Sequence, residues 1–253
     1  MLSQKRGAMG YIALFLLFCL IFTALIGGFA WLGASLPGPN KKISAEDTSA
    51  DARPIIVIDA GHGGEDGGAS GEDGTKEKDL NLLVAQSLSD ILSAAGYDVR
   101  MTRTDDRLLY DLYGDLADYT GHKKTYDLRN RLRFTKEAGA DLLISIHMNK
   151  FPQSRYSGLQ VYYSTNAPES RTVAEVIRNY TKLYLQPDNE RETKAATSSI
   201  YLMHRCEIPA VMVECGFLSN EEELSRLKDE TYRRQLALVI ACAAAECLSG
   251  TTQ

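Results

Sequence analysis

Short apolar runs alternate with amphipathic stretches after residue 54, and this alternation predicts the elements of the fold. Apolar runs that fit strands are Ile55–Asp59, Asp98–Thr102, Leu142–His147, Gly158–Tyr163 and Ala210–Glu214, with a further apolar edge segment at Ile200–Met203. Apolar residues recur at helical spacing within about 76–95, 125–138, 168–185, 220–228 and 231–248. Residues 105–124 are polar and rich in tyrosine, and they predict a long loop. Continuous apolar runs suit strands buried on both faces, so we expect an α/β fold with helices on both faces of one sheet.

The N-terminal region differs from the rest in charge. Residues 11–36 carry no charged side chain, a run of 26. A signal-peptide core is typically about 7–15 residues long, whereas a membrane-spanning helix needs about 20. We therefore expect residues 11–36 to form a transmembrane anchor, with a signal sequence as the alternative. Residues 37–54 are rich in Pro, Ser, Ala and charge, and they predict a linker.

The charges around the uncharged run predict its orientation. Lys5 and Arg6 lie within residues 1–10, which contain no acid, and this favours a cytoplasmic tail there. A lysine pair at residues 41–42 flanks the other end and weakens the preference. Residues 55–250 would then form one exported domain, at the outer face of the cytoplasmic membrane or in the cell wall.

The net charge bears on possible binding partners, and the cysteine pattern bears on disulfides. The formal net charge is −5, and it becomes −7 without Lys5 and Arg6. An acidic domain argues against nucleic acid as a partner. Four of the five cysteines follow the uncharged run, without a CxxC pair or a regular spacing. We interpret them as buried small apolar residues, with a Cys206–Cys215 disulfide as the alternative in an oxidising compartment.

Three candidate metal ligands stand at the ends of predicted elements. His62 follows the strand Ile55–Asp59, His147 ends the strand Leu142–His147, and Glu77 opens a helix. In open α/β sheets, the active site lies at the carboxyl ends of the strands. Glu77 also falls on the apolar face of its helix, where a carboxylate needs a partner. Two imidazoles and one carboxylate are the ligand set of a catalytic zinc ion with one position left for water.

Glu214 ends a third apolar run and is the candidate catalytic residue. Beside a zinc ion it would take a proton from the water and pass it to a leaving amine. As a fourth ligand it would instead close the site and make it structural. The adjacent Cys215 raises a Cys/His nucleophile as an alternative. Neighbouring side chains of a strand point to opposite faces, which disfavours that role for Cys215.

The loop over residues 61–74 carries seven glycines in 14 residues, directly after a predicted strand. Strand, glycine-rich loop and helix also occur in phosphate-binding sites, but neither GxGxxG nor GxxxxGK[ST] is present. The four acids of this loop would repel a phosphate, which disfavours nucleotide binding.

The remaining charged candidates have simpler interpretations. His122 and His204 are expected at the surface or in a supporting position. Arg103, Arg129 and Arg131 are candidates to bind an anionic group of a substrate, but for each of them we favour a solvated or ion-paired structural role.

Four separated motifs, taken in order, resemble the zinc-dependent N-acetylmuramoyl-L-alanine amidases of the Amidase_3 family. They are Asp59–Gly64 (DAGHGG), Glu77 at a helix start, Ser145–Asn149 (SIHMN) and Val213–Asn220 (VECGFLSN). The resemblance implies a twisted, mostly parallel sheet flanked by helices. It also implies one zinc ion on the residues His62, Glu77 and His147, catalysis by Glu214, and cleavage of the amide between the lactyl group of N-acetylmuramic acid and L-alanine in peptidoglycan.

A closer resemblance is to the germination-specific amidases of spore formers. It is carried by the stretch Asp115–Arg129 and by Ser157–Tyr163, while Cys215 departs from the aliphatic residue usual at that position. It implies removal of peptides from muramic acid in the spore cortex, so that muramic lactam can form. A zinc carboxypeptidase-like peptidase and a non-catalytic, membrane-tethered wall-binding protein are the alternatives. The sequence leaves open whether a protein partner activates the enzyme.

Overall fold

The computed structural model describes residues 53–249, and the structural statements below refer to that part of the chain. Its strands are β1 Ile55–Ala60, β2 Asp98–Met101, β3 Leu142–Asn149, β4 Gln160–Tyr163, β5 Lys194–Ala195 and β6 Ala210–Phe217. Its helices are α2 Glu77–Ala94, α3 Lys123–Glu137, α4 Glu169–Tyr184, α5 Tyr201–Arg205, α6 Glu221–Lys228 and α7 Glu230–Ser249. The expected cytoplasmic tail (1–10), the anchor or signal sequence (11–36) and all but the last two residues of the linker lie outside the described residues. Within the described range, no helix combines the length and the apolar character needed to cross a bilayer.

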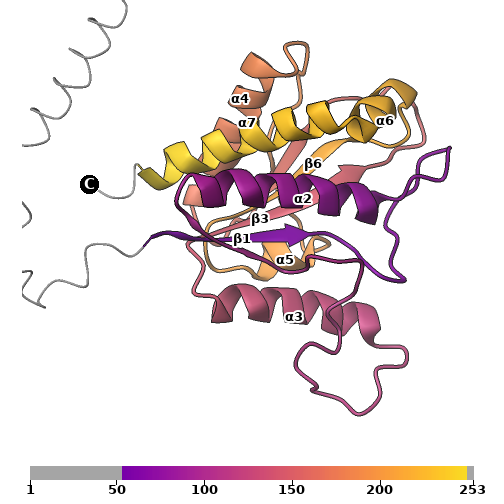
Figure 1. The fold of residues 1–253 in the computed structure, drawn as a ribbon, viewed down its shortest axis with the longest axis vertical. Helices are drawn as coiled ribbons and strands as arrows, with labels where there is room; N and C mark the ends of the chain where they lie inside the picture. Colours follow the sequence, from indigo (N-terminus) through magenta and orange to yellow (C-terminus); the bar gives the residue numbers. More distant parts are fainter. Residues whose placement is uncertain (1–52, 250–253) are drawn as a thin grey trace, which may run out of the picture. The chain divides into compact units, whose positions relative to one another are not determined.

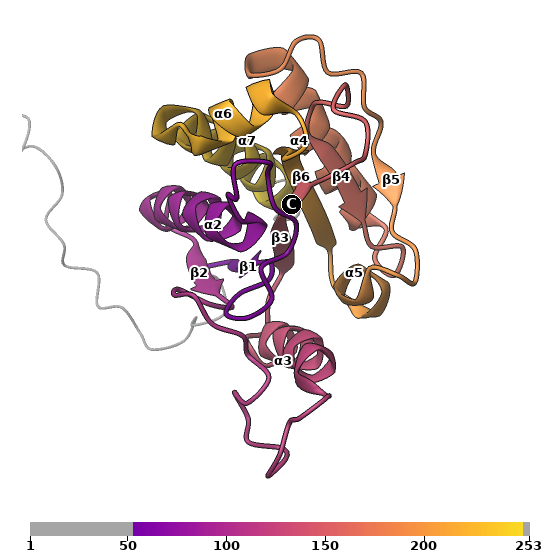
Figure 2. The same cartoon turned by 90° about the vertical axis from the view of Figure 1, so that its right-hand side faces the viewer.

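One six-stranded sheet, in the order β2-β1-β3-β6-β4-β5, forms the centre of the domain. Strands β2, β1, β3 and β6 are parallel neighbours, whereas β4 runs antiparallel to β6 and carries the short β5 on its outer edge. Helices cover both faces of the sheet, as Figures 1 and 2 show. The expected α/β fold with a mostly parallel sheet is therefore confirmed.

The two faces of the sheet have different chemistry, because successive side chains of a strand point to opposite sides. One face is apolar: Ile56 and Ile58 of β1 pack with the inner sides of α2, α4 and α7. The other face, under α3 and α5, begins with a small apolar cluster around Val57. It then becomes polar toward the carboxyl ends of the strands, where Asp59 and Ser145 are buried. The candidate site lies at this polar end.

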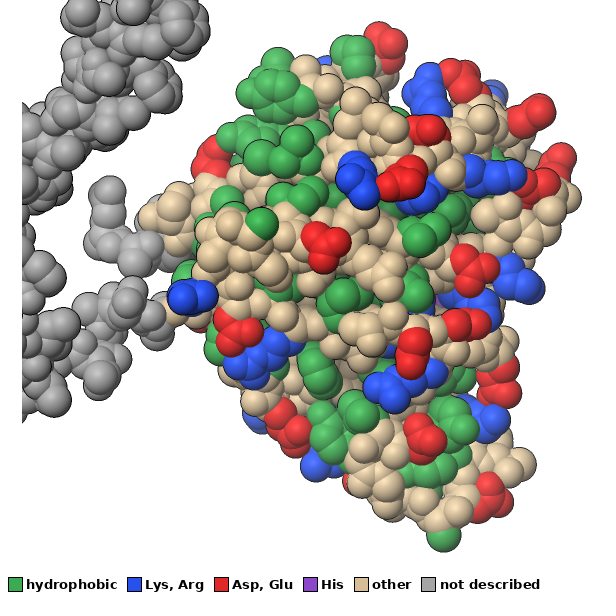
Figure 3. Space-filling view, in the orientation of Figure 1, with side chains coloured by type: hydrophobic (Ala, Val, Ile, Leu, Met, Phe, Trp, Pro, Cys, Tyr) green, Lys and Arg blue, Asp and Glu red, His purple; other side chains and the backbone are tan. Residues whose placement is uncertain are grey.

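The outer surface over α2 and α7 has mixed charge. On the face seen in Figure 3, acidic and basic side chains are interspersed, with apolar side chains between them. Two of the exposed apolar residues are Leu83 of α2 and Leu238 of α7. This face therefore offers neither a basic stripe nor a single-sign patch.

Two sequence expectations about local structure were wrong. The apolar edge segment Ile200–Met203 lies largely in the helix α5, and the edge strand is β5 instead. Short apolar runs fit buried helices as well as strands, and Leu202 and Met203 are buried beneath the sheet near α3. Strands β3 and β6 also continue through Asn149 and Phe217, so that His147 and Glu214 lie within their strands rather than at the ends.

The expectation of buried cysteines is confirmed for two of the four in the described range and is wrong for Cys242, which is exposed, while Cys247 is partly buried. Cys206 and Cys215 are free thiols and both are buried. The two residues belong to the clusters on opposite faces of the sheet, which excludes the alternative disulfide between them in this structure.

Candidate metal centre and active site

The turn after β1 holds His62 in an uncommon backbone conformation. Its φ is 61°, and His62 is the one non-glycine residue with positive φ in the described range. This region costs an L-residue roughly 1–2 kcal/mol, so the surrounding structure has to impose it. Arg131 donates to the carbonyl oxygens of Ala60 (2.8 Å) and His62 (2.7 Å). Arg103 donates to those of Ala60 (2.8 Å) and Gly61 (3.0 Å), so two buried guanidinium groups fix three consecutive carbonyls.

The arginine that fixes this turn is held by acids on the polar face of the sheet. Arg131 pairs with Asp59 at 2.7 Å and with Asp127 at 2.8 Å. Burial alone would raise the pKa of Asp59, but the charge of Arg131 and a hydrogen bond from Ser145 outweigh it and lower the pKa to about 2. Asp59 is therefore an anion at neutral pH. Of the three arginines considered from the sequence, Arg103 and Arg131 have structural roles.

Two glycines of the loop are needed because side chains of the site come very close. A Cβ on Gly61 would lie 2.3 Å from the ring of His147. A Cβ on Gly68, whose φ is +64°, would lie 2.5 Å from Glu77 Oε2. The abundance of glycine in this loop thus reflects close packing around candidate ligands rather than a phosphate cradle.

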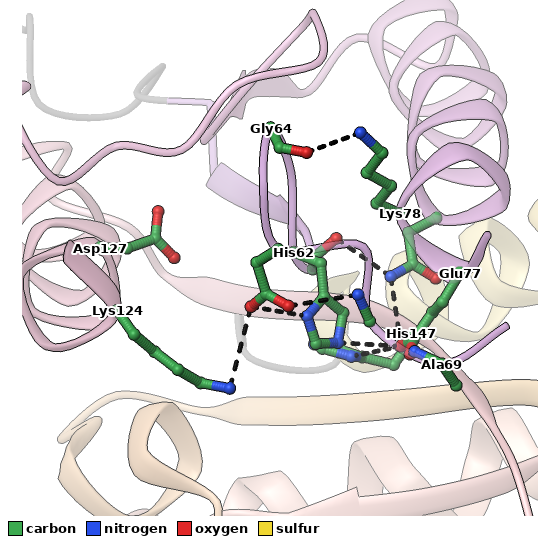
Figure 4. A network of polar contacts seen from close by, with 12 residues as sticks. His62, Gly64, Ala69, Glu77, Lys78, Lys124, Asp127 and His147 are labelled. Carbon is green, nitrogen blue, oxygen red and sulfur yellow. Dashed lines mark hydrogen bonds and ion pairs between the residues drawn. The ribbon is translucent and has the colours of Figure 1, made fainter.

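The three predicted metal ligands come together from three elements (Figure 4). Glu77 Oε1 lies 3.2 Å from His62 Nε2 and 2.9 Å from His147 Nδ1. One ligand atom from each residue lies within 4.8 Å of the others. His62 and His147 are 85 positions apart in the sequence, yet their imidazole nitrogens and the carboxylate oxygen of Glu77 lie close enough together to bind one metal ion.

Backbone and side-chain donors fix the carboxylate of Glu77. Its Oε2 accepts a hydrogen bond from Ala69 N at 2.7 Å, and its Oε1 accepts one from Met148 N at 3.1 Å. Asn81, one turn further along α2, adds a weaker contact at 3.4 Å. Burial opposes ionisation of Glu77, but its hydrogen bonds with His147 and His62 prevail and hold its pKa well below the usual range.

His62 has the opposite shift. Burial alone would lower its pKa, but hydrogen bonds with Glu77 and Asp66 raise the pKa to about 8. The raised pKa favours an imidazolium at neutral pH, so His62 and Glu77 attract each other as opposite charges. A cation placed between them would take over the attraction that the imidazolium now supplies.

Glu214 lies beside this cluster on the same face of the sheet. It is paired in register with His147, on the neighbouring strand β3. Its Oε2 is buried and has no hydrogen-bond partner among the described residues. Burial raises the pKa of Glu214 to about 7, with Glu77 contributing in the same direction. Cys215 points to the opposite, apolar side, as the alternation of the strand predicted.

The donor set and the orphaned carboxylate together fit a divalent cation. Two imidazole nitrogens and one carboxylate oxygen form a three-residue set typical of catalytic zinc, and they leave a position open. A cavity of about 240 Å³ adjoins them and is lined by both histidines and Glu214. Its lining also includes Lys124, Ile200, Leu202 and Met203.

The other candidates from the sequence lie away from the cluster. His122 and His204 are exposed, in agreement with the surface interpretation. Arg129 lies over the ring of Tyr126, 5.5 Å from its centroid.

Sequence reasoning did not find Asp66 and Asn81, which contact His62 and Glu77. Their spacing of four residues from a predicted ligand, His62–Asp66 and Glu77–Asn81, is the signal that could have indicated them.

An α/β sheet with two imidazoles and a carboxylate at the carboxyl edge of its strands is an arrangement typical of hydrolases that use a metal ion. Residues 56–246 match the N-acetylmuramoyl-L-alanine amidase family, Amidase_3, and the chain belongs to that family. The resemblance expected from the four motifs is thereby confirmed, and with it amidase activity on peptidoglycan.

Individual relatives support a closer grouping. The chain is 36% identical over 183 residues to the germination-specific N-acetylmuramoyl-L-alanine amidase of Bacillus subtilis, covering 72% of this chain and 75% of that protein. It is 29% identical over 206 residues to the amidase LytC of the same organism, covering 81% of this chain and 37% of LytC.

Solved structures agree with these relatives. The CwlD amidase of Clostridioides difficile, solved in complex with the GerS lipoprotein, superposes with a TM-score of 0.73 at 37% identity, over 78% of this chain and 99% of that one. The amidase AmiC2 of Nostoc punctiforme gives a TM-score of 0.64 at 28% identity, over 78% of this chain and 97% of that one. The described fold is thus that of amidase catalytic domains.

Proposed function

We propose that this protein cleaves the amide between the lactyl group of N-acetylmuramic acid and L-alanine with one zinc ion bound by His62, Glu77 and His147, and with Glu214 as the general base. The observation that carries the proposal is the convergence of the three ligands beside a buried carboxylate oxygen that has no partner. A zinc ion bound there would polarise the substrate carbonyl and lower the pKa of a coordinated water to about 7.

Glu214 handles the proton in this proposal. A water oxygen forms a bond with the carbonyl carbon while the carboxylate of Glu214 accepts the proton of that water. The bond from carbon to nitrogen then breaks, and Glu214 returns the proton to the nitrogen of L-alanine. The products are a lactyl carboxylate on the sugar and a stem peptide with a free N-terminal amine.

A role of Glu214 as a fourth ligand is less well supported. The ligand atoms that lie within 4.8 Å of one another come from three residues, and Glu214 is outside that set. Its raised pKa also suits a group that exchanges a proton near neutral pH better than a permanently charged ligand.

We further propose that the substrate is the peptidoglycan of the spore cortex and that the enzyme acts outside the cytoplasmic membrane, tethered through residues 11–36. Support comes from the similarity to the germination-specific amidase of B. subtilis. The related CwlD amidase was solved with a lipoprotein, and we propose that this chain also works with a protein partner.

Product analysis tests the proposed reaction. The full-length protein would be incubated with purified cortex and vegetative peptidoglycan, with and without a chelator, and then with zinc restored. We expect zinc-dependent release of peptides that begin with L-alanine, and muramic acid with a free lactyl carboxylate, seen by mass spectrometry. Peptides shortened at their C-termini on intact muramoyl linkages would favour the carboxypeptidase alternative. Binding to the wall without any product would favour the wall-binding alternative.

A further inference from the structure

Each ring nitrogen of His62 faces a different carboxylate. Nε2 is directed at Glu77, at 3.2 Å, on the side of the candidate ligand cluster. Nδ1 is directed away from the cluster, toward Asp66 Oδ2, at 3.0 Å. Glu77 belongs to the ligand set, whereas Asp66 has no role in the function proposed above.

The position of Asp66 is set by its own loop. Its backbone exchanges two hydrogen bonds of 3.0 Å with Gly63, which close the turn that contains His62. Its Oδ1 accepts from Gly68 N at 3.2 Å, which leaves Oδ2 for the imidazole. Lys124, at the start of α3, adds a more distant charge at 3.9 Å from Oδ2. The carboxylate of Asp66 is therefore oriented by backbone contacts and does not depend on Lys124 for its position.

A carboxylate at this place determines what the imidazole can offer to a metal. When Nδ1 carries the hydrogen and donates it to Asp66, Nε2 has a free lone pair directed at the cluster. Such a partner also fixes the rotation of the ring, and its loss typically weakens metal binding about 10–100-fold. The second ring nitrogen of His147 has no comparable partner among residues 53–249, so only one of the two imidazoles is oriented in this way.

From this geometry we propose that Asp66 is a positioning residue that orients His62 and sets its tautomer for metal binding. The inference rests on the zinc site proposed above. It assigns to Asp66 an effect on metal affinity, and no contact with the substrate.

The neighbouring residue supplies a matched control. Glu65 lies in the same turn, carries the same charge and pairs with a lysine of α3, Lys123, at 3.0 Å. Among the described residues, no hydrogen bond or ion pair joins Glu65 to His62. Removing the charge of Glu65 therefore tests the general effect of one negative charge in this loop, without the hydrogen bond to the imidazole.

The experiment compares Asp66→Ala, Asp66→Asn and Glu65→Ala in the full-length protein. Zinc dissociation constants would be measured by competition with a chromophoric chelator, and the melting temperature of each metal-free protein would be recorded. We expect Asp66→Ala to raise the Kd about 10–100-fold. Asp66→Asn should restore part of the affinity, because its amide oxygen still accepts from Nδ1. Glu65→Ala should bind zinc like the wild type, and the visible spectrum of the cobalt-substituted protein should change only in the Asp66 variants.

The possible outcomes separate the two proposals. Wild-type zinc affinity in both Asp66 variants, with the wild-type cobalt spectrum, would overturn the role of Asp66. Equal weakening by Asp66→Ala and Glu65→Ala would also overturn it, since bulk charge would then explain the effect. A wild-type protein that binds no zinc would instead contradict the proposed zinc site itself.

Discussion

The two glutamates of the site lie in opposite electrostatic surroundings. Glu77, at the start of α2, accepts two backbone hydrogen bonds and faces two histidines, and its pKa is held low. Glu214, within β6, has one buried oxygen without a hydrogen-bond partner among the described residues, and its pKa is raised to about 7. Both adjoin His147, which contacts Glu77 directly and is the register neighbour of Glu214.

This difference teaches which carboxylate can do which task. A permanent anion with fixed geometry suits a metal ligand, whereas a carboxylate that changes protonation near neutral pH suits a general base. The surroundings that separate the pKa values therefore separate the roles.

Removing an imidazole from the Glu77 side should have the largest effect. We expect His62→Ala to lose both bound zinc and turnover, with activity falling to that of the chelator-treated wild type, because a two-ligand site cannot retain the metal. Metal content by mass spectrometry and peptide release from peptidoglycan would be measured on the same samples. The exposed His204 supplies the control, since His204→Ala should change neither. Stoichiometric zinc in His62→Ala would show that the ligand assignment is wrong.

Replacing the proposed base, Glu214, should leave the metal in place. Glu214→Gln preserves the shape of the side chain but cannot accept the proton, and we expect kcat to fall about 10²–10⁴-fold. KM should change much less, because the substrate still meets the same surfaces. Steady-state kinetics on a defined muramoyl peptide would measure both constants. Near-normal kcat in this variant would refute the role of Glu214.

The acid side of the pH–rate profile should report Glu214. The base works only when ionised, so kcat/KM should rise with pH up to the pKa of Glu214 and then level off. Burial raises that pKa to about 7 without a metal, and a bound cation lowers it. The rise of kcat/KM with pH should therefore level off at or below about pH 7, and below that point kcat/KM should fall about tenfold per pH unit. Zinc occupancy would be measured at each pH as the control, and a rate that rises on acidification would contradict the assignment.

The smallest effect concerns the stability of the metal-free protein. In the folded protein the pKa of Glu214 is about 7, above the ordinary value of 4.5. Between these two pH values folding is therefore accompanied by proton uptake at Glu214. The stability that the protonated Glu214 contributes is lost as the pH rises from 4.5 to 7. Glu214→Gln should therefore be more stable than the wild type at pH 8, by about 1–3 kcal/mol. Glu77 has a lowered pKa, so its contribution is present above pH 4.5 and Glu77→Gln should be less stable. Urea unfolding with a chelator present measures the free energy of unfolding of both variants. A change of the same sign in Glu214→Gln and Glu77→Gln would contradict the opposite surroundings of the two glutamates.

Much of the fold followed from the sequence because its strands and helices have strong patterns. Helix α2 was expected over about 76–95 and spans Glu77–Ala94, since its apolar stripe is unambiguous. The two-residue strand β5 has no such pattern, and its pairing with β4 depends on tertiary structure alone. Strand β6 was expected to end at Glu214 because an acid normally closes an apolar run, but here burial of Phe217 extends it.

The candidate ligands could be proposed from the sequence because each stands at or near the end of an element, and an α/β sheet brings these ends to one edge. The support around them could not. Arg103 and Arg131 fix the His62 turn from positions 41 and 69 residues away, and only the folded chain shows that their guanidinium groups reach its carbonyls. Nor does sequence reveal that one oxygen of Glu214 is buried without a partner, since this depends on every neighbouring side chain.

The division between the two carboxylates is tested most directly by metal content. Glu77→Gln and Glu214→Gln would be stripped of metal, equilibrated with zinc, passed through a desalting column and measured for zinc per protein. The account predicts close to no zinc in Glu77→Gln and a full complement in Glu214→Gln. Equal zinc content in the two variants would contradict it.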